Sequence, residues 1–217
     1  WKELLIVFHG HDLIKFNPPI WFLVALFNCN ILFYLVHFLR NKYLPAMFAL
    51  TLLIGCTGFY LGKAQITLPL YLDVAMTALP FYVAGFWIRR YNFFLFPHHR
   101  FDKLIPLFVL LALLVMHFTA TTLGMRTNNY SGNIFQVYIA AFAGIFMIML
   151  LCKKVERAKI ISYLGRYSII TLSIHGPILH FLEPLIARYI HNSWAQATML
   201  LFITLSICIL LTPLFLK

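Results

Sequence analysis

Residues 69–90, PLYLDVAMTALPFYVAGFWIRR, decide the fold of this chain. The stretch is mostly apolar, with one carboxylate near its start, Asp73, and two arginines at its end, Arg89 and Arg90. A helix of about twenty apolar residues, rising about 1.5 Å per residue, crosses a hydrocarbon core of about 30 Å. The pattern therefore predicts a membrane-spanning helix that ends at a positive stop. Asp73 lies inside this span, where a charge is costly, so we expect it to face protein or water.

The composition of the whole chain is that of a membrane protein. Its 217 residues are 62% hydrophobic and 11% charged, and the mean hydropathy is +0.87. A soluble domain is about 45–50% apolar and about 25% charged, so we predict an all-α, polytopic transmembrane helix bundle. The net charge of +11 does not indicate nucleic-acid binding, because the basic residues stand between hydrophobic segments. The four cysteines are scattered through apolar spans and predict small buried side chains.

The other hydrophobic segments complete a single membrane domain. Its predicted spans are 20–39, 43–62, 69–88, 104–123, 134–152, 167–187 and 195–216. Alternating spans place twelve of the 17 lysines and arginines on one side and five on the other. The positive-inside rule makes the richer side cytoplasmic. We therefore expect a multi-pass protein of the cell (inner) membrane, with the N-terminus of this chain outside the cytoplasm and its C-terminus inside. The connection at 124–133, GMRTNNYSGN, is predicted to be a surface loop.

Asp73 is the first candidate for chemistry. It would lie about 6 Å inside the outer end of its span. One interpretation is a carboxylate that faces an outer, water-filled cavity, where it binds a hydroxylated acceptor or orients a base. The alternative is an interfacial aspartate that is hydrogen-bonded to loop backbone.

His175 is the second candidate, because it is an ionisable residue about 12 Å from the inner end of its span. Pro177 follows two residues later, removes a backbone donor and should kink the helix. The carbonyl freed in this way could form a polar niche beside the imidazole. The alternative is a neutral histidine that is hydrogen-bonded to a neighbouring helix. The other histidines within spans, His37, His117 and His180, are not selected.

Arg89 and Arg90 set the topology in the simplest interpretation. In a sharper one they combine with Arg100, Lys103 and the basic residues of 153–166 into an electropositive cytoplasmic mouth. Such a mouth could hold a phosphorylated donor such as a coenzyme A ester. Anionic lipid headgroups would bind it equally well.

Asn28 and Asn30 are predicted to form hydrogen bonds between helices rather than to bind ligands. The chain contains no GxSxG, no Gly-rich phosphate loop and no HExxH sequence. We therefore expect neither the chemistry of these soluble enzymes nor a metal site.

Three stretches stand in an order and spacing that match a known family: KFNPPIWFLVALF at 15–27, LYLDVAMTALPFYVAGFWIRR at 70–90 and YLGRYSIITLSIHGPIL at 163–179. Together they resemble the acyltransferase 3 family of bacterial multi-pass membrane acyltransferases. The first resembles its WFL segment. The second resembles the family segment that has an aspartate, then PFYxxG, and then basic residues at the end of the helix. The third resembles the family segment that contains LGxxS followed by HxPI. The resemblance covers nearly the whole chain.

The resemblance implies an enzyme that moves an acyl group, usually acetyl, from acyl-coenzyme A on the cytoplasmic side. The acceptor would be a sugar hydroxyl of a cell-surface glycan or of its lipid-linked precursor. No bound cofactor is implied; acetyl-coenzyme A or another acyl-coenzyme A is the co-substrate, and membrane lipid is a further partner. The best-known active residues of the family, an Arg and a His in its first helices, have no match here. We therefore expect the chain to begin after them, and activity of the chain alone is not assured.

The candidate residues follow from both lines of argument. The catalytic candidates are Asp73 and His175, with the main catalytic residues expected upstream of Trp1. The donor-binding candidates are Arg89, Arg90, Arg100 and Lys103. The residues assigned to family motifs are Trp21, Pro80, Gly85, Gly165 and Pro177.

The alternative function is a transporter or flippase of a lipid-linked sugar or small solute. It would place Asp73 and His175 in a substrate path and would consume no acetyl-coenzyme A. A seven-helix receptor is disfavoured, because no helix ends in a DRY-like or NPxxY-like motif and the last span has no lysine for retinal. A third alternative, a structural subunit of a membrane complex, also stays open.

Overall fold

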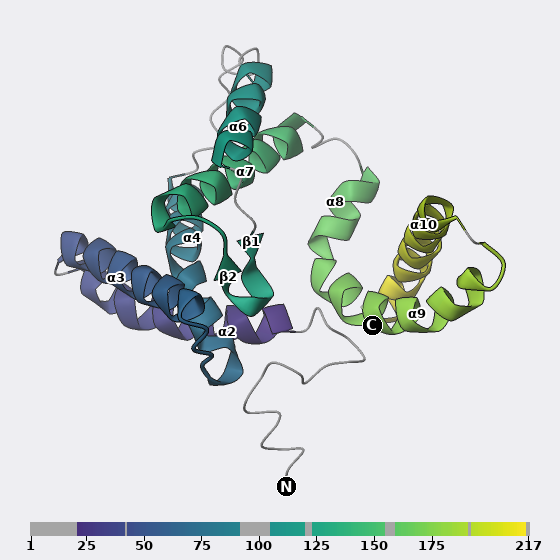
Figure 1. Cartoon of the computed structure of the whole chain (residues 1–217), viewed down its shortest axis with the longest axis horizontal. Helices are drawn as coiled ribbons and strands as arrows, with labels where there is room; N and C mark the ends of the chain where they lie inside the picture. Colours follow the sequence, from purple (N-terminus) through teal and green to yellow (C-terminus); the bar gives the residue numbers. More distant parts are fainter. Residues whose placement is uncertain are drawn as a thin grey trace, which may run out of the picture. The chain divides into compact units, whose positions relative to one another are not determined.

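A computed structural model describes residues 21–41, 43–91, 105–119, 123–154, 159–190 and 192–215. These residues are almost entirely helical, which confirms the predicted all-α class. From Phe22 onward the chain divides into two compact units, Phe22–Val155 and Glu156–Lys217. Figure 1 labels the elements of both, and each unit is described by itself below.

The first unit combines long helices with a short antiparallel hairpin (Figure 1). Its elements are α2 (Trp21–His37), η2 (Phe38–Asn41), α3 (Leu44–Lys63), η3 (Pro69–Tyr71), α4 (Leu72–Arg90), α6 (Ile105–Thr119), β1 (Leu123–Gly124), η4 (Met125–Thr127), β2 (Asn129–Tyr130) and α7 (Ile134–Lys154). Helix α3 begins with a proline in its first turn, where a missing N–H costs nothing. In the hairpin, Leu123 pairs with Tyr130 and Gly124 with Asn129.

The second unit is a helical hairpin preceded by a short helix. Its elements are α8 (Lys159–Arg166), α9 (Ser168–Ala187), α10 (Ser193–Leu211) and η5 (Thr212–Phe215). Helices α9 and α10 pack against each other, and Asn192 caps α10 by accepting the backbone N–H groups of Trp194 at 3.0 Å and Ala195 at 3.3 Å. Helix α9 runs as one helix through Pro177 and Pro184.

Six of the seven predicted spans are helices long and apolar enough to cross a membrane. They are Trp21–Arg40, Leu44–Lys63, Pro69–Arg90, Ile134–Cys152, Ser168–Ala187 and Ser193–Phe215. The predicted span 104–123 corresponds to α6, which is described as a helix of 15 residues. At about 1.5 Å per residue, its described part is shorter than a hydrocarbon core of about 30 Å.

The stretch 69–90 does not form one continuous helix from its first residue, as the span prediction assumed. Leu70 has φ 57° and Tyr71 has φ 58°, so both adopt the left-handed conformation. This conformation costs about 1–2 kcal/mol per non-glycine residue and interrupts a right-handed helix. The side chain of Asn28 holds the bend, because its Nδ2 donates to the Leu70 carbonyl at 2.6 Å. Helix α4 therefore begins at Leu72.

The prediction for the two asparagines of α2 is confirmed. Asn28 reaches the segment that leads into α4, as described above. Asn30 Oδ1 accepts a hydrogen bond from the Tyr82 hydroxyl of α4 at 2.6 Å. Both side chains thus join α2 to the chain of α4, where an unpaired amide in an apolar environment would be costly.

Glycines on one face of α3 allow α4 and the hairpin to approach closely. A Cβ added to Gly55 would lie 2.6 Å from Cγ of Pro80, and one added to Gly58 would lie 2.5 Å from the backbone N of Thr77. A Cβ on Gly62 would overlap the carbonyl oxygen of Asn128. Gly58 and Gly62 form a GxxxG pattern, whose small residues are typical of close helix contacts in membranes.

Replacement of Gly58 by alanine is expected to destabilise the protein by about 2 kcal/mol, because the added methyl group would overpack a backbone contact. Gly85→Ala in α4 is the matched control: its added Cβ would meet nothing within 4 Å among the described residues. Unfolding of both variants in mixed detergent micelles measures the difference. Equal stability of Gly58→Ala and Gly85→Ala would contradict the close α3–α4 packing.

Candidate functional site

Asp73 lies in the first turn of α4 and is only 1% exposed. Its Oδ1 accepts the backbone N–H of Leu68 at 3.4 Å, and its Oδ2 accepts a hydrogen bond from Asn128 Nδ2 at 3.2 Å. The partial positive charge at a helix N-terminus also favours a carboxylate there. The hypothesis that Asp73 faces a water-filled cavity is therefore wrong, because protein groups enclose the carboxylate. The contact with Leu68 agrees with the alternative, an aspartate bonded to loop backbone.

The connection at 124–133 is largely exposed, as its polar sequence predicted, but two of its residues, Asn128 and Tyr130, are buried. Asn128, with φ 48° and 1% exposed, inserts between α3 and α4. Its Nδ2 also donates to the Gly58 carbonyl at 3.0 Å, and its Oδ1 accepts from the Thr77 hydroxyl at 3.0 Å. Asparagine tolerates the left-handed conformation better than most residues. Asn128 can be buried because its side-chain amide satisfies polar groups of two helices.

Tyr130 anchors the same loop. It is 5% exposed and its ring stacks on Phe59 of α3, with centroids 5.5 Å apart. Burial, and after it the nearby Asp73 carboxylate, raises the pKa of Tyr130. The tyrosine therefore stays neutral at physiological pH and donates its hydroxyl to the sulfur of Met125 at 3.3 Å.

The donor-binding candidates are only partly covered by the structure. Arg89 and Arg90 are exposed at the end of α4, and the guanidinium carbon of Arg90 lies 5.8 Å from the centroid of the Trp87 ring. Arg100 and Lys103 lie outside the described residues. The predicted electropositive mouth thus stays a prediction.

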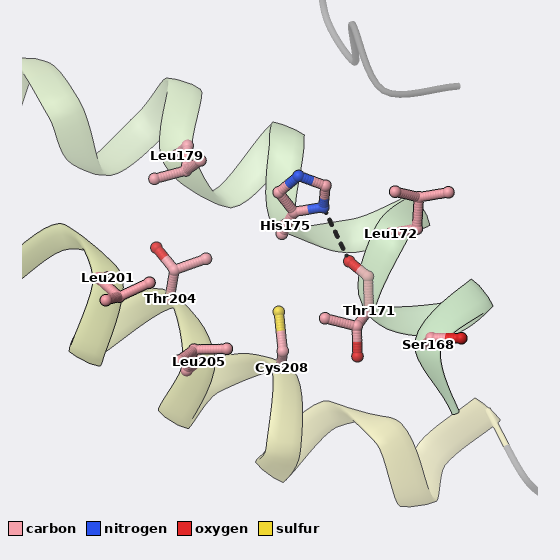
Figure 2. Close-up of a pocket in the computed structure, with 9 residues that line it drawn as sticks. All are labelled: Ser168, Thr171, Leu172, His175, Leu179, Leu201, Thr204, Leu205 and Cys208. Atoms are coloured by element: carbon pink, nitrogen blue, oxygen red, sulfur yellow. Dashed lines mark hydrogen bonds between the residues drawn. The ribbon is translucent and has the colours of Figure 1, made fainter. Parts of the chain in front are cut away.

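His175 lines a pocket of about 280 Å³ between α9 and α10 (Figure 2). The wall is mostly apolar, with hydroxyl and thiol groups among aliphatic side chains. The residues that line it are Ser168, Thr171, Leu172, His175, Leu179, Leu201, Thr204, Leu205 and Cys208. The thiol of Cys208 points from α10 toward α9 (Figure 2). The pocket thus brings together residues from two helices that lie more than twenty positions apart in the sequence.

The imidazole of His175 is fixed by a backbone contact within α9. Its Nδ1 lies 2.9 Å from the carbonyl oxygen of Thr171, shown as the dashed line in Figure 2. A carbonyl oxygen can only accept, so Nδ1 carries the proton and Nε2 of the neutral ring keeps its lone pair. The ring thus contacts the Thr171 carbonyl, one turn earlier in the same helix, rather than a neighbouring helix.

Two hydroxyls of the same pocket have no hydrogen-bond partner in the part of the chain that the structure describes. They are the buried Oγ1 atoms of Thr171 and Thr204. A buried hydroxyl without a partner costs about 1–3 kcal/mol. Both hydroxyl oxygens are buried within the wall of the pocket. Ser168, Thr171 and His175 are spaced three and four residues apart, so they share one face of a helix. This spacing is the sequence signal that could have identified the polar face of α9.

The motif residues have unequal structural roles. Pro80 packs against Gly55 at the α3–α4 contact, and Trp21 begins α2. A Cβ on Gly85 or on Gly165 would meet no described atom within 4 Å. Within the described ranges, no group of three His, Cys, Asp or Glu side chains could hold a metal ion.

The long apolar helices and the histidine pocket define a multi-pass membrane protein with an ionisable site inside a span. The model of the acyltransferase 3 family, described as an acyltransferase domain, matches residues 1–213. The chain belongs to this family of membrane acyltransferases, as its motifs predicted. No curated protein and no solved structure shows significant similarity to the chain.

Proposed function

We propose that the protein transfers an acyl group, usually acetyl, from acyl-coenzyme A to a sugar hydroxyl of a cell-surface glycan or of its lipid-linked precursor. Membership of the acyltransferase family supports the reaction class. The observation that carries the proposal is the His175 pocket, where the Thr171 carbonyl fixes Nδ1 of the ring and Nε2 keeps its lone pair. Acyl transfer to a hydroxyl needs a group that takes the hydroxyl proton.

The reaction assigned to this pocket begins with His175 as a general base. Its Nε2 takes the proton of the acceptor hydroxyl while the acceptor oxygen attacks the thioester carbonyl. The contact from Nδ1 to the Thr171 carbonyl holds the ring and stabilises the imidazolium that forms. When the tetrahedral oxyanion collapses, the carbon–sulfur bond breaks and the leaving thiolate takes the proton from His175.

Asp73 has a structural role in this proposal. The sequence made it a catalytic candidate, but its carboxylate is enclosed and accepts hydrogen bonds from the Leu68 backbone and from Asn128 of the hairpin. The donor is proposed to approach from the cytoplasmic side, where Arg89 and Arg90 attract its phosphates. The positive-inside distribution supports this orientation, in a cell (inner) membrane.

The complete gene product in membrane vesicles, supplied with acetyl-labelled coenzyme A and cell-envelope glycan, tests the function. The expected result is label in the glycan fraction that is absent from vesicles without the protein. Folded protein that transfers no label from acetyl-coenzyme A or longer acyl-coenzyme A would contradict the proposal and would favour the transporter alternative.

A further inference from the structure

The wall of the His175 pocket differs between its two ends. Ser168, the first residue of α9, lies at one end, and Leu179 and Leu201 lie at the other, on the far side of His175 (Figure 2). Along α9, Ser168 stands about 10 Å before His175 and Leu179 about 6 Å beyond it. In the predicted orientation the Ser168 end faces the cytoplasm. A donor that enters from that side therefore meets the histidine first and the leucines beyond it.

The leucine end, which we define by Leu179, Leu201 and Leu205, offers a ligand no hydrogen bond from its side chains. The hydroxyl of the neighbouring Thr204 is buried within the wall. Three groups meet in the proposed reaction. The sugar acceptor carries hydroxyls and the arm of coenzyme A carries amides, and both would lose free energy in such surroundings. The acyl chain is apolar, so it is the group that the leucine end fits.

The size of the pocket exceeds what an acetyl group needs. Its volume of about 280 Å³ equals about nine water volumes of about 30 Å³ each. A methylene group occupies nearly the same volume as a water molecule in the liquid. Once the reacting carbonyl and the acceptor oxygen are placed, room is left for about six carbon groups. Acetyl supplies one methyl group, so most of the leucine end would lose its dispersion contacts.

We propose that the leucine end binds the acyl chain of the donor, and that the preferred chain has about four to eight carbons rather than being acetyl. This inference rests on the proposed function, because it names the acyl group that the reaction moves. Each methylene that leaves water for an apolar pocket favours binding about threefold. The value of kcat/KM should therefore rise from acetyl to hexanoyl and fall once the chain is longer than the pocket.

Transfer by the complete gene product in membrane vesicles tests the chain length. Coenzyme A esters of acetyl, butanoyl, hexanoyl, octanoyl and dodecanoyl groups, labelled in the acyl group, are supplied with cell-envelope glycan. We expect kcat/KM for hexanoyl to exceed that for acetyl at least about tenfold. The highest kcat/KM for acetyl would overturn the inference and leave the acyltransferase function intact.

Two substitutions should move the preference in opposite directions. Leu179→Ala enlarges the leucine end and should favour octanoyl or dodecanoyl over hexanoyl. Leu201→Phe fills it and should lower the ratio of hexanoyl to acetyl transfer about tenfold. The matched controls are Leu185→Ala in α9 and Leu210→Phe in α10, because these leucines are 56% and 74% exposed and do not line the pocket. Both controls should keep the wild-type preference.

An unchanged preference in the two pocket variants would also overturn the inference. If Leu179→Ala does not fold, the result of Leu201→Phe decides, because Leu201 is 55% exposed and a larger side chain there displaces no buried group.

Binding without transfer separates this inference from the proposed function. The thioethers S-ethyl- and S-hexyl-coenzyme A carry no acyl carbonyl and cannot react. In lipid nanodiscs, S-hexyl-coenzyme A should bind the wild type at least about tenfold more tightly than S-ethyl-coenzyme A, and Leu201→Phe should remove most of this difference. Leu210→Phe controls for partition into the bilayer. The same difference in a protein that transfers no acyl group would support the leucine end and contradict the enzyme. Equal affinities would overturn the leucine end.

Discussion

Replacement of Asn128 by alanine is expected to destabilise the protein by about 3 kcal/mol, because one side chain satisfies three buried groups. Its amide donates to the Asp73 carboxylate and to the Gly58 carbonyl and accepts from the Thr77 hydroxyl. Alanine supplies none of these contacts. Among the described residues, the carboxylate then keeps one hydrogen bond, the longer one from the Leu68 backbone N–H at 3.4 Å. A buried charge that loses a partner is among the most destabilising changes in a protein.

Asn129→Ala is the control for the loop itself, because Asn129 is the exposed neighbour in β2. Unfolding in mixed detergent micelles should show little change for this variant. A double-mutant cycle that combines Asn128→Ala with Asp73→Ala then measures the interaction between these two side chains apart from their other contacts. We expect the double variant to be at least about 1 kcal/mol more stable than the sum of the single losses predicts, because neither group is left alone. Additive losses would show that the two side chains do not interact.

The fold class could be predicted because side chains that face lipid are apolar, so a membrane protein has an unusually hydrophobic composition. Six long apolar helices lie where the hydrophobic segments placed them. The break at Leu70 could not be predicted, because leucine and tyrosine have no preference for left-handed backbone. The bend depends on Asn28, which is 42 residues away in sequence. The close packing of α3 on α4 did have a signal, since Gly58 and Gly62 stand in a GxxxG pattern.

Some residues of the candidate sites could likewise be predicted from the sequence, and others could not. His175 was found because an ionisable residue inside a span is rare and costly. Asn128 was missed because a polar, turn-rich segment is typical of exposed loops, and only tertiary contacts show that its amide reaches two helices. His37 was not selected from the sequence, and only the structure shows that its buried Nδ1 has no hydrogen-bond partner among the described residues.

Replacement of His175 by asparagine is expected to lower the rate of acyl transfer by about 10²- to 10⁴-fold, the usual contribution of a positioned general base. Asparagine can still donate to the Thr171 carbonyl from nearly the position of Nδ1, so the contact within α9 is kept. It has no group that can take the proton at the position of Nε2. The loss should therefore fall on kcat and leave KM for the donor nearly unchanged.

His180→Asn provides the control for this substitution, since His180 is an exposed residue of the same helix that does not line the pocket. It should transfer label at the wild-type rate. A purely structural His175 would give a different pattern: the loss in His175→Asn would follow the amount of folded protein, and the folded fraction would keep its kcat. Full activity of folded His175→Asn would remove the base from the mechanism, because no other described side chain of the pocket has a nitrogen that can accept a proton. The family assignment would stand, and the proton acceptor would have to lie outside this pocket.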